Sequence, residues 1–446
     1  MSDLVIGYLS FPILLVLIFL RAPICLAMLI CGIGGLWMTT GGTTVFMARL
    51  KSEVYTTFSG YTLSIIPMFL LMGQFATQSG MSRALFRAAG AWLGHLRGGM
   101  AMSAIVACAG FGAICGSSLA TAATMSKTAL PELRKFGYSG GFSTATLAAG
   151  GTLGILIPPS VILVIYAILA EQNISKLFLA AVVPGLLAML GYMLTVAIYA
   201  RLYPDAAGTR PRMGYAERFR ALVAVWPVLI VFLLVVGGIY RGWFTPTEGA
   251  AVGALGTGIV ALFSGVLSWS VLRDSLIETA TGTGMIYFIV FGAAFYNGFL
   301  AITGVPQELS RFVASQGLNP WMIMVLILLF YLVLGCLMDS LSMVLLTVPI
   351  LWPVVQTLDF GLTPEGVGLW FGILVLIVVE VGLITPPVGM NLFIINSMDG
   401  ATPMTATYRA VLFFVASDIL RVGLLLAFPV ITLAAVDGRL ALLWPF

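Results

Sequence analysis

Long apolar runs dominate the chain, and they predict membrane-spanning helices. Of the 446 residues, 60% are hydrophobic and 9% are charged, whereas about 25% of residues are charged in soluble domains. A run of about 18 or more apolar residues crosses a hydrocarbon core of ~30 Å as a helix. We therefore expect an all-α polytopic membrane protein with about ten spans. These are residues 4–20, 23–40, 60–79, 141–170, 177–200, 222–240, 247–270, 282–303, 366–397 and 408–436.

Two of the predicted spans share a double-proline motif. Segments 141–170 and 366–397 each hold about 30 residues, although about 20 suffice to cross a bilayer. The first contains the sequence GILIPP (154–159) and the second GLITPP (382–387). Proline removes a backbone donor and clashes with the preceding helical turn. Each motif therefore predicts a helix that is broken within the membrane.

Small polar residues interrupt two further apolar stretches, 99–130 and 320–356. The interruptions read CGSSL (115–119) and LMDSL (337–341), so Ser118 and Ser340 occupy equivalent places. We expect each stretch to form a re-entrant hairpin that enters and leaves the membrane on the same side. A repeated pair of interrupted hydrophobic segments is the best sequence indication of a transporter binding site near the bilayer midplane.

The distribution of arginine and lysine predicts opposite orientations for the two copies. With segment 80–98 in the cytoplasm, thirteen of these residues fall in inside loops and six in outside loops. The positive-inside rule then favours periplasmic N- and C-termini. Basic residues at 97, 134 and 135 flank the first hairpin, whereas the second is flanked by Asn319, Asp359 and Glu365. The first hairpin should open to the cytoplasm and the second outward, as expected of an inverted repeat.

These patterns divide the chain into five predicted parts. They are N-terminal scaffold helices (1–54), a first inverted repeat (55–200), a cytoplasmic linker with scaffold helices (201–279), a second inverted repeat (280–436) and a C-terminal tail (437–446). Within the first cytoplasmic stretch, residues 80–98 are predicted to form an interfacial helix with arginines on its wet side.

Four stretches resemble the large membrane subunit of the tripartite ATP-independent periplasmic (TRAP) transporters, the DctM-like family. They are residues 116–125 (GSSLATAATM), 151–160 (GTLGILIPPS), 244–250 (FTPTEGA) and 380–391 (EVGLITPPVGMN). The likeness covers nearly the whole chain, and the stretches occur in the same order as in the family. One departure falls in the second hairpin, where the family commonly has Glu after Met and this chain has Asp339.

The resemblance implies a function, two partners and a location. The function is Na⁺-coupled import of organic anions, usually carboxylates, by an elevator-like movement. The partners are a periplasmic substrate-binding protein (DctP-like) and a small four-helix membrane subunit (DctQ-like), which we expect to be a separate chain. The location is the bacterial inner membrane. Na⁺ is the coupling ion, and neither an additional cofactor nor a nucleic-acid partner is expected.

Breaks in membrane helices expose oxygen atoms that suit this chemistry. Free N–H groups at helix N-termini attract anions, whereas carbonyls and hydroxyls suit Na⁺, a hard cation. We expect one Na⁺ at each repeat and the substrate between them. The predicted sodium ligands are Ser117, Ser118, Thr121, Thr152, Gly154 and Ile157 in the first repeat and Ser340, Ser342, Thr385, Gly389 and Asn391 in the second. The predicted substrate ligands are Ser118, Ser160 and Asp339.

Other interpretations of the same residues stay open. The hairpin serines also suit simple packing helices, in which their hydroxyls bond to their own backbone. Glu380 suits either a functional role or a structural one that ties the broken helix together. For Asp418 and Arg421, three residues apart, an internal salt bridge is expected, and for Glu248 a helix cap.

The sequence also bears on three competing functions: an enzyme, a channel and a self-sufficient symporter. A P-loop, an HExxH motif, a metal-spaced Cys/His set and a nucleophile beside a histidine are all lacking, which argues against an enzyme. A channel would need a continuous pore. The main alternative is a self-sufficient Na⁺- or H⁺-coupled carboxylate symporter that needs no binding protein.

Overall fold

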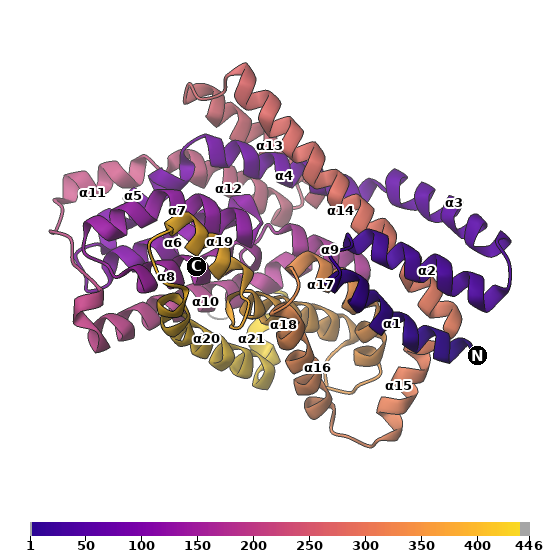
Figure 1. Cartoon of the computed structure of the whole chain (residues 1–446). Coiled ribbons are helices and arrows are strands. Elements are labelled where there is room, and N and C mark those ends of the chain that lie inside the picture. Colours follow the sequence, from indigo (N-terminus) through magenta and orange to yellow (C-terminus); the bar gives the residue numbers. More distant parts are fainter. Residues whose placement is uncertain (1, 438–446) are drawn as a thin grey trace.

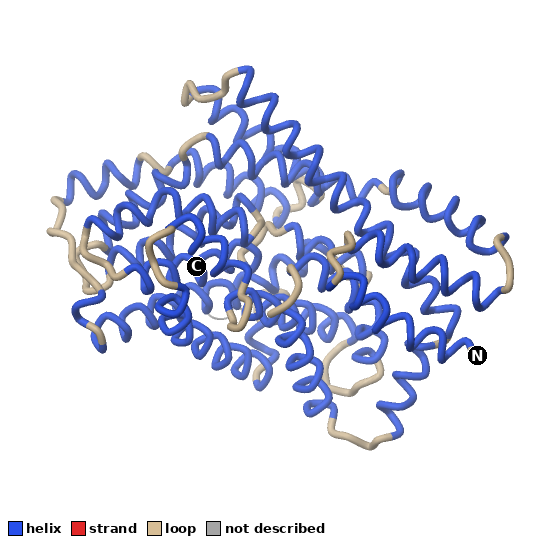
Figure 2. The backbone as a smooth tube through the Cα atoms, viewed as in Figure 1, coloured by secondary structure: helices blue, strands red, loops and turns tan. Residues whose placement is uncertain are grey.

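The computed structural model describes residues 2–437, and this part of the chain consists of helices and short connections (Figures 1 and 2). The predicted all-α class is confirmed. Five helices are long and apolar enough to cross a membrane, or up to eight if each bent helix pair is one span. Two further apolar helices, α1 (Asp3–Phe19) and α2 (Ile24–Thr40), coincide with the first two predicted spans. The predicted tail lies, apart from its first residue, outside the described residues.

One group of helices packs around α14. Helices α1, α2, α3 and α4 contact α14 directly. Helix α13 packs on α4, and α12 packs on α13. The remaining bounds are α3 (Thr44–Ser59), the 3₁₀ turn η1 (Tyr61–Ser64), α4 (Ile65–Gln78), α12 (Trp226–Tyr240), α13 (Pro246–Phe263) and α14 (Trp269–Thr303). The capping role predicted for Glu248 is confirmed, because it forms a capping box with Thr245 at the start of α13.

Two helical segments in this group were not predicted. Helix α3 carries Arg49, Lys51 and Glu53, so it does not read as an apolar run. Helix α14 begins at Trp269, well before the predicted span 282–303. Its first turns contain the exposed charged residues Arg273, Asp274 and Glu278, whereas Ser275 and Thr279 are buried. Polar and charged residues interrupt both segments, so neither contains the continuous apolar run that predicts a span.

The first repeat forms the predicted hairpin and broken helix. In hairpin 1, α6 (Gly99–Cys115) and α7 (Ser118–Lys135) pack against one another. The broken helix consists of α8 (Gly140–Leu156) and α9 (Val161–Leu169), which are bent by 47° at the double proline. Helix α10 (Ile174–Leu202) follows.

The second repeat has the same order of elements. Hairpin 2 consists of α16 (Pro320–Gly335) and α17 (Ser340–Gln356). The broken helix follows as α18 (Pro364–Ile384) and α19 (Met390–Asp399). Helices α20 (Met404–Ala427) and α21 (Pro429–Leu433) end the described part of the chain.

A short amphipathic helix precedes each hairpin. These helices are α5 (Met81–Leu93) and α15 (Val305–Ser315), and each begins after a glycine in the left-handed conformation, Gly80 or Gly304. Helix α5 confirms that a helix forms within 80–98 and that Arg83 and Arg87 are exposed on it, whereas its interfacial position stays a prediction. The linker after α10 contains the 3₁₀ turn η2 (Pro204–Ala206) and α11 (Tyr215–Val223), which packs on α5. In Figure 1, α5 and α11 lie at the left end of the molecule and α15 at the lower right.

The two broken helices run in opposite directions. At the start of α8, the Thr144 hydroxyl lies 2.8 Å from that of Thr407, in the first turn of α20, and Thr407 also lies 3.2 Å from the Asn396 amide oxygen near the end of α19. At the start of α18, the Gly368 carbonyl accepts a 2.6 Å hydrogen bond from Tyr166, near the end of α9. Figure 1 shows the chain passing from left to right between α8 and α9 and from right to left between α18 and α19. The predicted inversion is therefore present.

The repeats also exchange contacts. Helix α9 of the first repeat packs against α17 of hairpin 2, and α19 of the second repeat packs against α7 of hairpin 1. The second contact includes an ion pair between Arg134 and the buried carboxylate of Asp399. Each hairpin is therefore held partly by the opposite repeat.

Paired glycines bring each hairpin against the break of its own repeat. A Cβ on Gly112 would collide with the backbone of Gly154. In the second repeat, a Cβ on Gly382 would lie 2.5 Å from the Cα of Gly335. Small residues allow helix backbones to approach closely in membranes. Here they place the hairpin tips beside the interrupted backbone.

We predict that Gly382→Ala weakens this contact in the second repeat. The added methyl group must push α16 away, and overpacking of this kind costs about 1–3 kcal/mol. The thermal unfolding midpoint of the purified protein in detergent should fall by several degrees. Gly423→Ala is the matched control, because a Cβ there meets no atom within 4 Å among the described residues. An equal midpoint for both variants would contradict the tight contact.

Candidate functional site

The tip of hairpin 1 lies directly against the first helix break. Gly116, at the turn, has φ +64°, and a Cβ on it would lie 3.3 Å from the carbonyl oxygen of Pro159. Ser117 caps α7 by accepting a 3.4 Å hydrogen bond from the Ala120 N–H. Ser160 caps α9 in the same way, through the N–H of Leu163. Two helix N-termini therefore start at this contact.

Several predicted sodium ligands meet at this contact. A Cβ on Gly154 would lie 2.5 Å from the Thr121 hydroxyl oxygen and 2.9 Å from the Ser117 carbonyl oxygen. The Thr121 hydroxyl is buried and has no hydrogen-bond partner among the described residues. Ile157 ends α8 with extended backbone. The contact thus gathers a carbonyl and a free hydroxyl where α8 stops.

Thr152 is engaged with another part of the protein. Its hydroxyl lies 2.7 Å from the Ala149 carbonyl and 3.0 Å from the phenolic oxygen of Tyr192 on α10. Tyr192 in turn donates a 2.7 Å hydrogen bond to Asp418 on α20. Asp418 forms a 2.7 Å ion pair with Arg421, as predicted. This buried network links the first break to α10 and α20.

The tip of hairpin 2 is capped by a carboxylate. Asp339 accepts a 3.1 Å hydrogen bond from the Ser342 N–H and a second from the Ser342 hydroxyl. The Ser342 hydroxyl is therefore bound to the same carboxylate that caps α17. The cap leaves a full negative charge at the tip, whereas hairpin 1 has the neutral Ser117 at the equivalent place.

The second break presents one fully buried amide without partners. Thr385 ends α18, and its hydroxyl donates a 2.6 Å hydrogen bond to the Val381 carbonyl. Gly389 begins α19 with φ +63°. Asn391, in the first turn of α19, is 0% exposed. Neither its amide oxygen nor its amide nitrogen has a hydrogen-bond partner within the part of the chain described.

Sequence reasoning left Glu380 out of the site, but the structure places it there. Its Oε1 accepts a 2.7 Å hydrogen bond from the Ser340 hydroxyl, and the residue is 1% exposed. The Ser118 hydroxyl of hairpin 1 lies close to the same carboxylate. Alignment of the repeats contained a signal, because Glu380 precedes Gly382 as Thr152 precedes Gly154. Both equivalent positions form side-chain hydrogen bonds to another helix, Thr152 to Tyr192 on α10 and Glu380 to Ser340 on α17.

The tips and breaks combine eight helix ends. Helices α7, α9, α17 and α19 begin there, while α6, α8, α16 and α18 end there. Each N-terminus carries free N–H groups and about half a positive charge, and each C-terminus carries free carbonyls and about half a negative charge. Such a region provides ligands for both an anion and a small cation.

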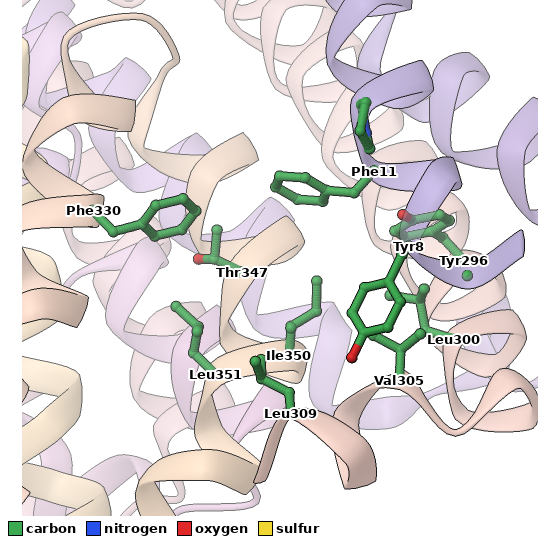
Figure 3. A pocket seen from close by; sticks show the side chains of 12 residues that line it. Tyr8, Phe11, Tyr296, Leu300, Val305, Leu309, Phe330, Thr347, Ile350 and Leu351 are labelled. Carbon is green, nitrogen blue, oxygen red and sulfur yellow. The ribbon is translucent and has the colours of Figure 1, made fainter. Parts of the chain in front are cut away.

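A separate apolar cavity lies between hairpin 2 and the N-terminal helices (Figure 3). It has a volume of about 310 Å³. Figure 3 shows Phe11 of α1 and Tyr296 of α14 on one side, with Phe330 of α16 and Ile350 of α17 on the other. The candidate site residues described above do not line it. The cavity therefore marks loose packing between two groups of helices.

Comparison with known proteins agrees with this architecture. The chain is 38% identical over 372 residues to the C4-dicarboxylate TRAP transporter large permease protein DctM of Pseudomonas aeruginosa, covering 81% of this chain and 83% of that protein. It is 30% identical over 422 residues to the sialic acid TRAP transporter large permease protein SiaM of Vibrio cholerae, covering 94% and 95%.

A solved structure and a family model add to these relatives. The Alcanivorax borkumensis YdaH transporter has a similar fold, with a TM-score of 0.61, 12% identity and coverage of 85% of this chain and 88% of that one. The model of the tripartite ATP-independent periplasmic transporter, DctM component, matches residues 11–431. The chain therefore belongs to this family of transporter permeases, as predicted from its sequence.

Proposed function

We propose that the chain is the large permease subunit of a Na⁺-coupled importer of an organic anion. The observation that carries this proposal is the junction of two inverted hairpins with two broken helices, where unpartnered oxygen atoms are buried. Buried polar atoms without partners are costly in a membrane protein, so they are a sign of a functional site. A bound ion or cargo molecule would supply the missing partners.

The helix ends suggest how ion and cargo share the site. Na⁺ would bind the Ser117 carbonyl and the Thr121 hydroxyl in the first repeat, and oxygen atoms near Ser340 and Asn391 in the second. The cargo would lie between them near Ser118, Ser160 and Asp339. A carboxylate cargo would be repelled by Asp339 unless a cation lies between the two. Cargo binding would therefore require Na⁺, which is the basis of coupled transport.

The cargo class and the partners rest on the relatives. Two of them are named for C4-dicarboxylates and for sialic acid, and all of these compounds are carboxylates. We infer a carboxylate cargo delivered by a periplasmic binding protein, with a small membrane subunit bound to the permease. The assembly would reside in the bacterial inner membrane with both permease termini in the periplasm.

The loose apolar interface supports an elevator-like movement. The hairpins, broken helices, α10 and α20 pack on one another. The cavity of about 310 Å³ lies between hairpin 2 and helices α1, α14 and α15, beside the places where α17 packs on α14 and α15. Close packing resists displacement, whereas a partly empty apolar contact opposes sliding less. The hairpin group would carry the site across the membrane along this interface.

We predict that uptake by reconstituted transporter requires both Na⁺ and the binding protein. The test uses permease and small subunit in proteoliposomes, with Na⁺ replaced by choline at fixed pH and ionic strength. Radiolabelled carboxylate should accumulate only with inward Na⁺ gradient and binding protein together. Uptake without the binding protein would favour the self-sufficient symporter. Uptake in choline driven by a pH gradient would favour H⁺ coupling.

A second prediction separates the charge of Asp339 from its cap. Asparagine caps helices about as well as aspartate, so Asp339→Asn should keep the fold and lose the charge. Uptake should fall by about tenfold or more, as expected for a loss of about 1.4 kcal/mol or more of binding free energy. Asp359→Asn is the control, since Asp359 is exposed in the loop after α17 and accepts a 2.8 Å hydrogen bond from the Gly361 N–H. Normal uptake by Asp339→Asn would remove this carboxylate from the site.

A further inference from the structure

Both hairpins meet at one buried carboxylate. Glu380 lies on α18, and its Oε1 accepts the hydrogen bond from Ser340 at the tip of hairpin 2. Ser118, which lies close to the same carboxylate, is the equivalent residue of hairpin 1. The other oxygen, Oε2, is buried and accepts no hydrogen bond within residues 2–437. At the junction of the two repeats, one oxygen of this carboxylate therefore has no hydrogen-bond donor among the residues that the structure describes.

The neighbouring charges do not neutralise Glu380. Asp418 on α20 acts on it as a second negative charge, and the guanidinium of Arg421 is paired with Asp418. Across the described residues, Glu380 forms no ion pair with a basic side chain. In its ionised form, Glu380 would give this group of two carboxylates and one guanidinium a net charge of −1 in the interior. An uncompensated buried charge is expensive, so a cation from outside the protein would stabilise the arrangement.

We propose that Na⁺ binds to Glu380 Oε2, with the hydroxyl oxygens of Ser118 and Ser340 as further ligands. This inference rests on the proposed function and adds a charged ligand to the oxygen atoms predicted from the sequence. A hydroxyl donates one hydrogen bond and keeps lone pairs for a cation. Ser340 can therefore donate its hydrogen bond to Glu380 Oε1 and coordinate the ion through its oxygen at the same time. The three ligands come from α7, α17 and α18.

Such an ion would join the two repeats. Hairpin 1 and hairpin 2 contribute one hydroxyl each, and Glu380 stands between them. With Na⁺ bound, the hairpin tips share a ligand set and are held as one unit. Without Na⁺, the hydroxyls of Ser118 and Ser340 no longer coordinate the same ion, and the two hairpin tips are held together less firmly. The ion would thereby set the relative position of the tips and, with it, the shape of the cargo site.

The test measures Na⁺-dependent thermal stability of the full-length protein in detergent. NaCl replaces choline chloride at constant ionic strength and pH, because a ligand that binds only the folded state raises its stability. We expect Na⁺ to raise the unfolding midpoint of the wild type. In Glu380→Gln, the half-saturating Na⁺ concentration should increase about tenfold or more, since even outer-shell partners of metal sites contribute about 10–100-fold. Glu365→Gln, an exposed glutamate at the start of the same helix, should match the wild type.

The outcomes distinguish this inference from the proposed function. A wild type without Na⁺-dependent stabilisation would count against Na⁺ coupling as a whole. A Na⁺-responsive wild type whose titration is unchanged in Glu380→Gln would overturn only the Glu380 site.

A double-mutant cycle serves if Glu380→Gln does not fold. Ser118→Ala and Ser340→Ala should lower the unfolding midpoint non-additively in Na⁺ and additively in choline, because a shared ion couples the two residues. Ser103→Ala is the control, since the Ser103 hydroxyl bonds to the Gly99 carbonyl of its own helix. Equal additivity in both salts would overturn the shared ion.

Discussion

The contact between glycine backbones at the hairpin tips is the constraint on which the rest of the site depends. Gly112 meets Gly154 in the first repeat, and Gly335 meets Gly382 in the second. A side chain at either contact would separate the hairpin from the broken helix. Only the absence of side chains lets carbonyls, hydroxyls and helix ends gather in so small a volume. The chemistry of the site therefore depends on glycine at these four positions.

The repeats share this geometry but not their charges. Ser117 caps hairpin 1 and Asp339 caps hairpin 2, although both residues do so through the N–H three positions later. Thr152 and Glu380 are likewise equivalent, yet only Glu380 is ionisable. In the first repeat a carboxylate is reached through Tyr192, at Asp418 on α20. Negative charge is thus concentrated on the second repeat, and the two halves of the site should not bind ions with equal strength.

Local features of the fold were predictable from the sequence. The double prolines predicted the broken helices, the polar interruptions predicted the hairpins, and the charge bias predicted their inversion. These signals act over about one span. Helix α3 and the first turns of α14 were missed because polar and charged residues interrupt their apolar pattern. The roles of Tyr192 and Glu380 depend on helices far apart in sequence, so they appeared only once those helices were placed. The sodium and substrate ligands stay predictions, although several of them lie together.

The exchange of contacts between the repeats has a consequence for biogenesis. Hairpin 1 leaves the ribosome long before its partner helix α19, which follows Arg134 by 265 residues at their ion pair. During that interval the arm α7 cannot complete its packing, and contacts so distant along a chain form slowly. The first repeat therefore stays incompletely packed in the bilayer until α19 of the second repeat has been synthesised. A transporter assembled in this way matures only when nearly the whole polypeptide has been inserted.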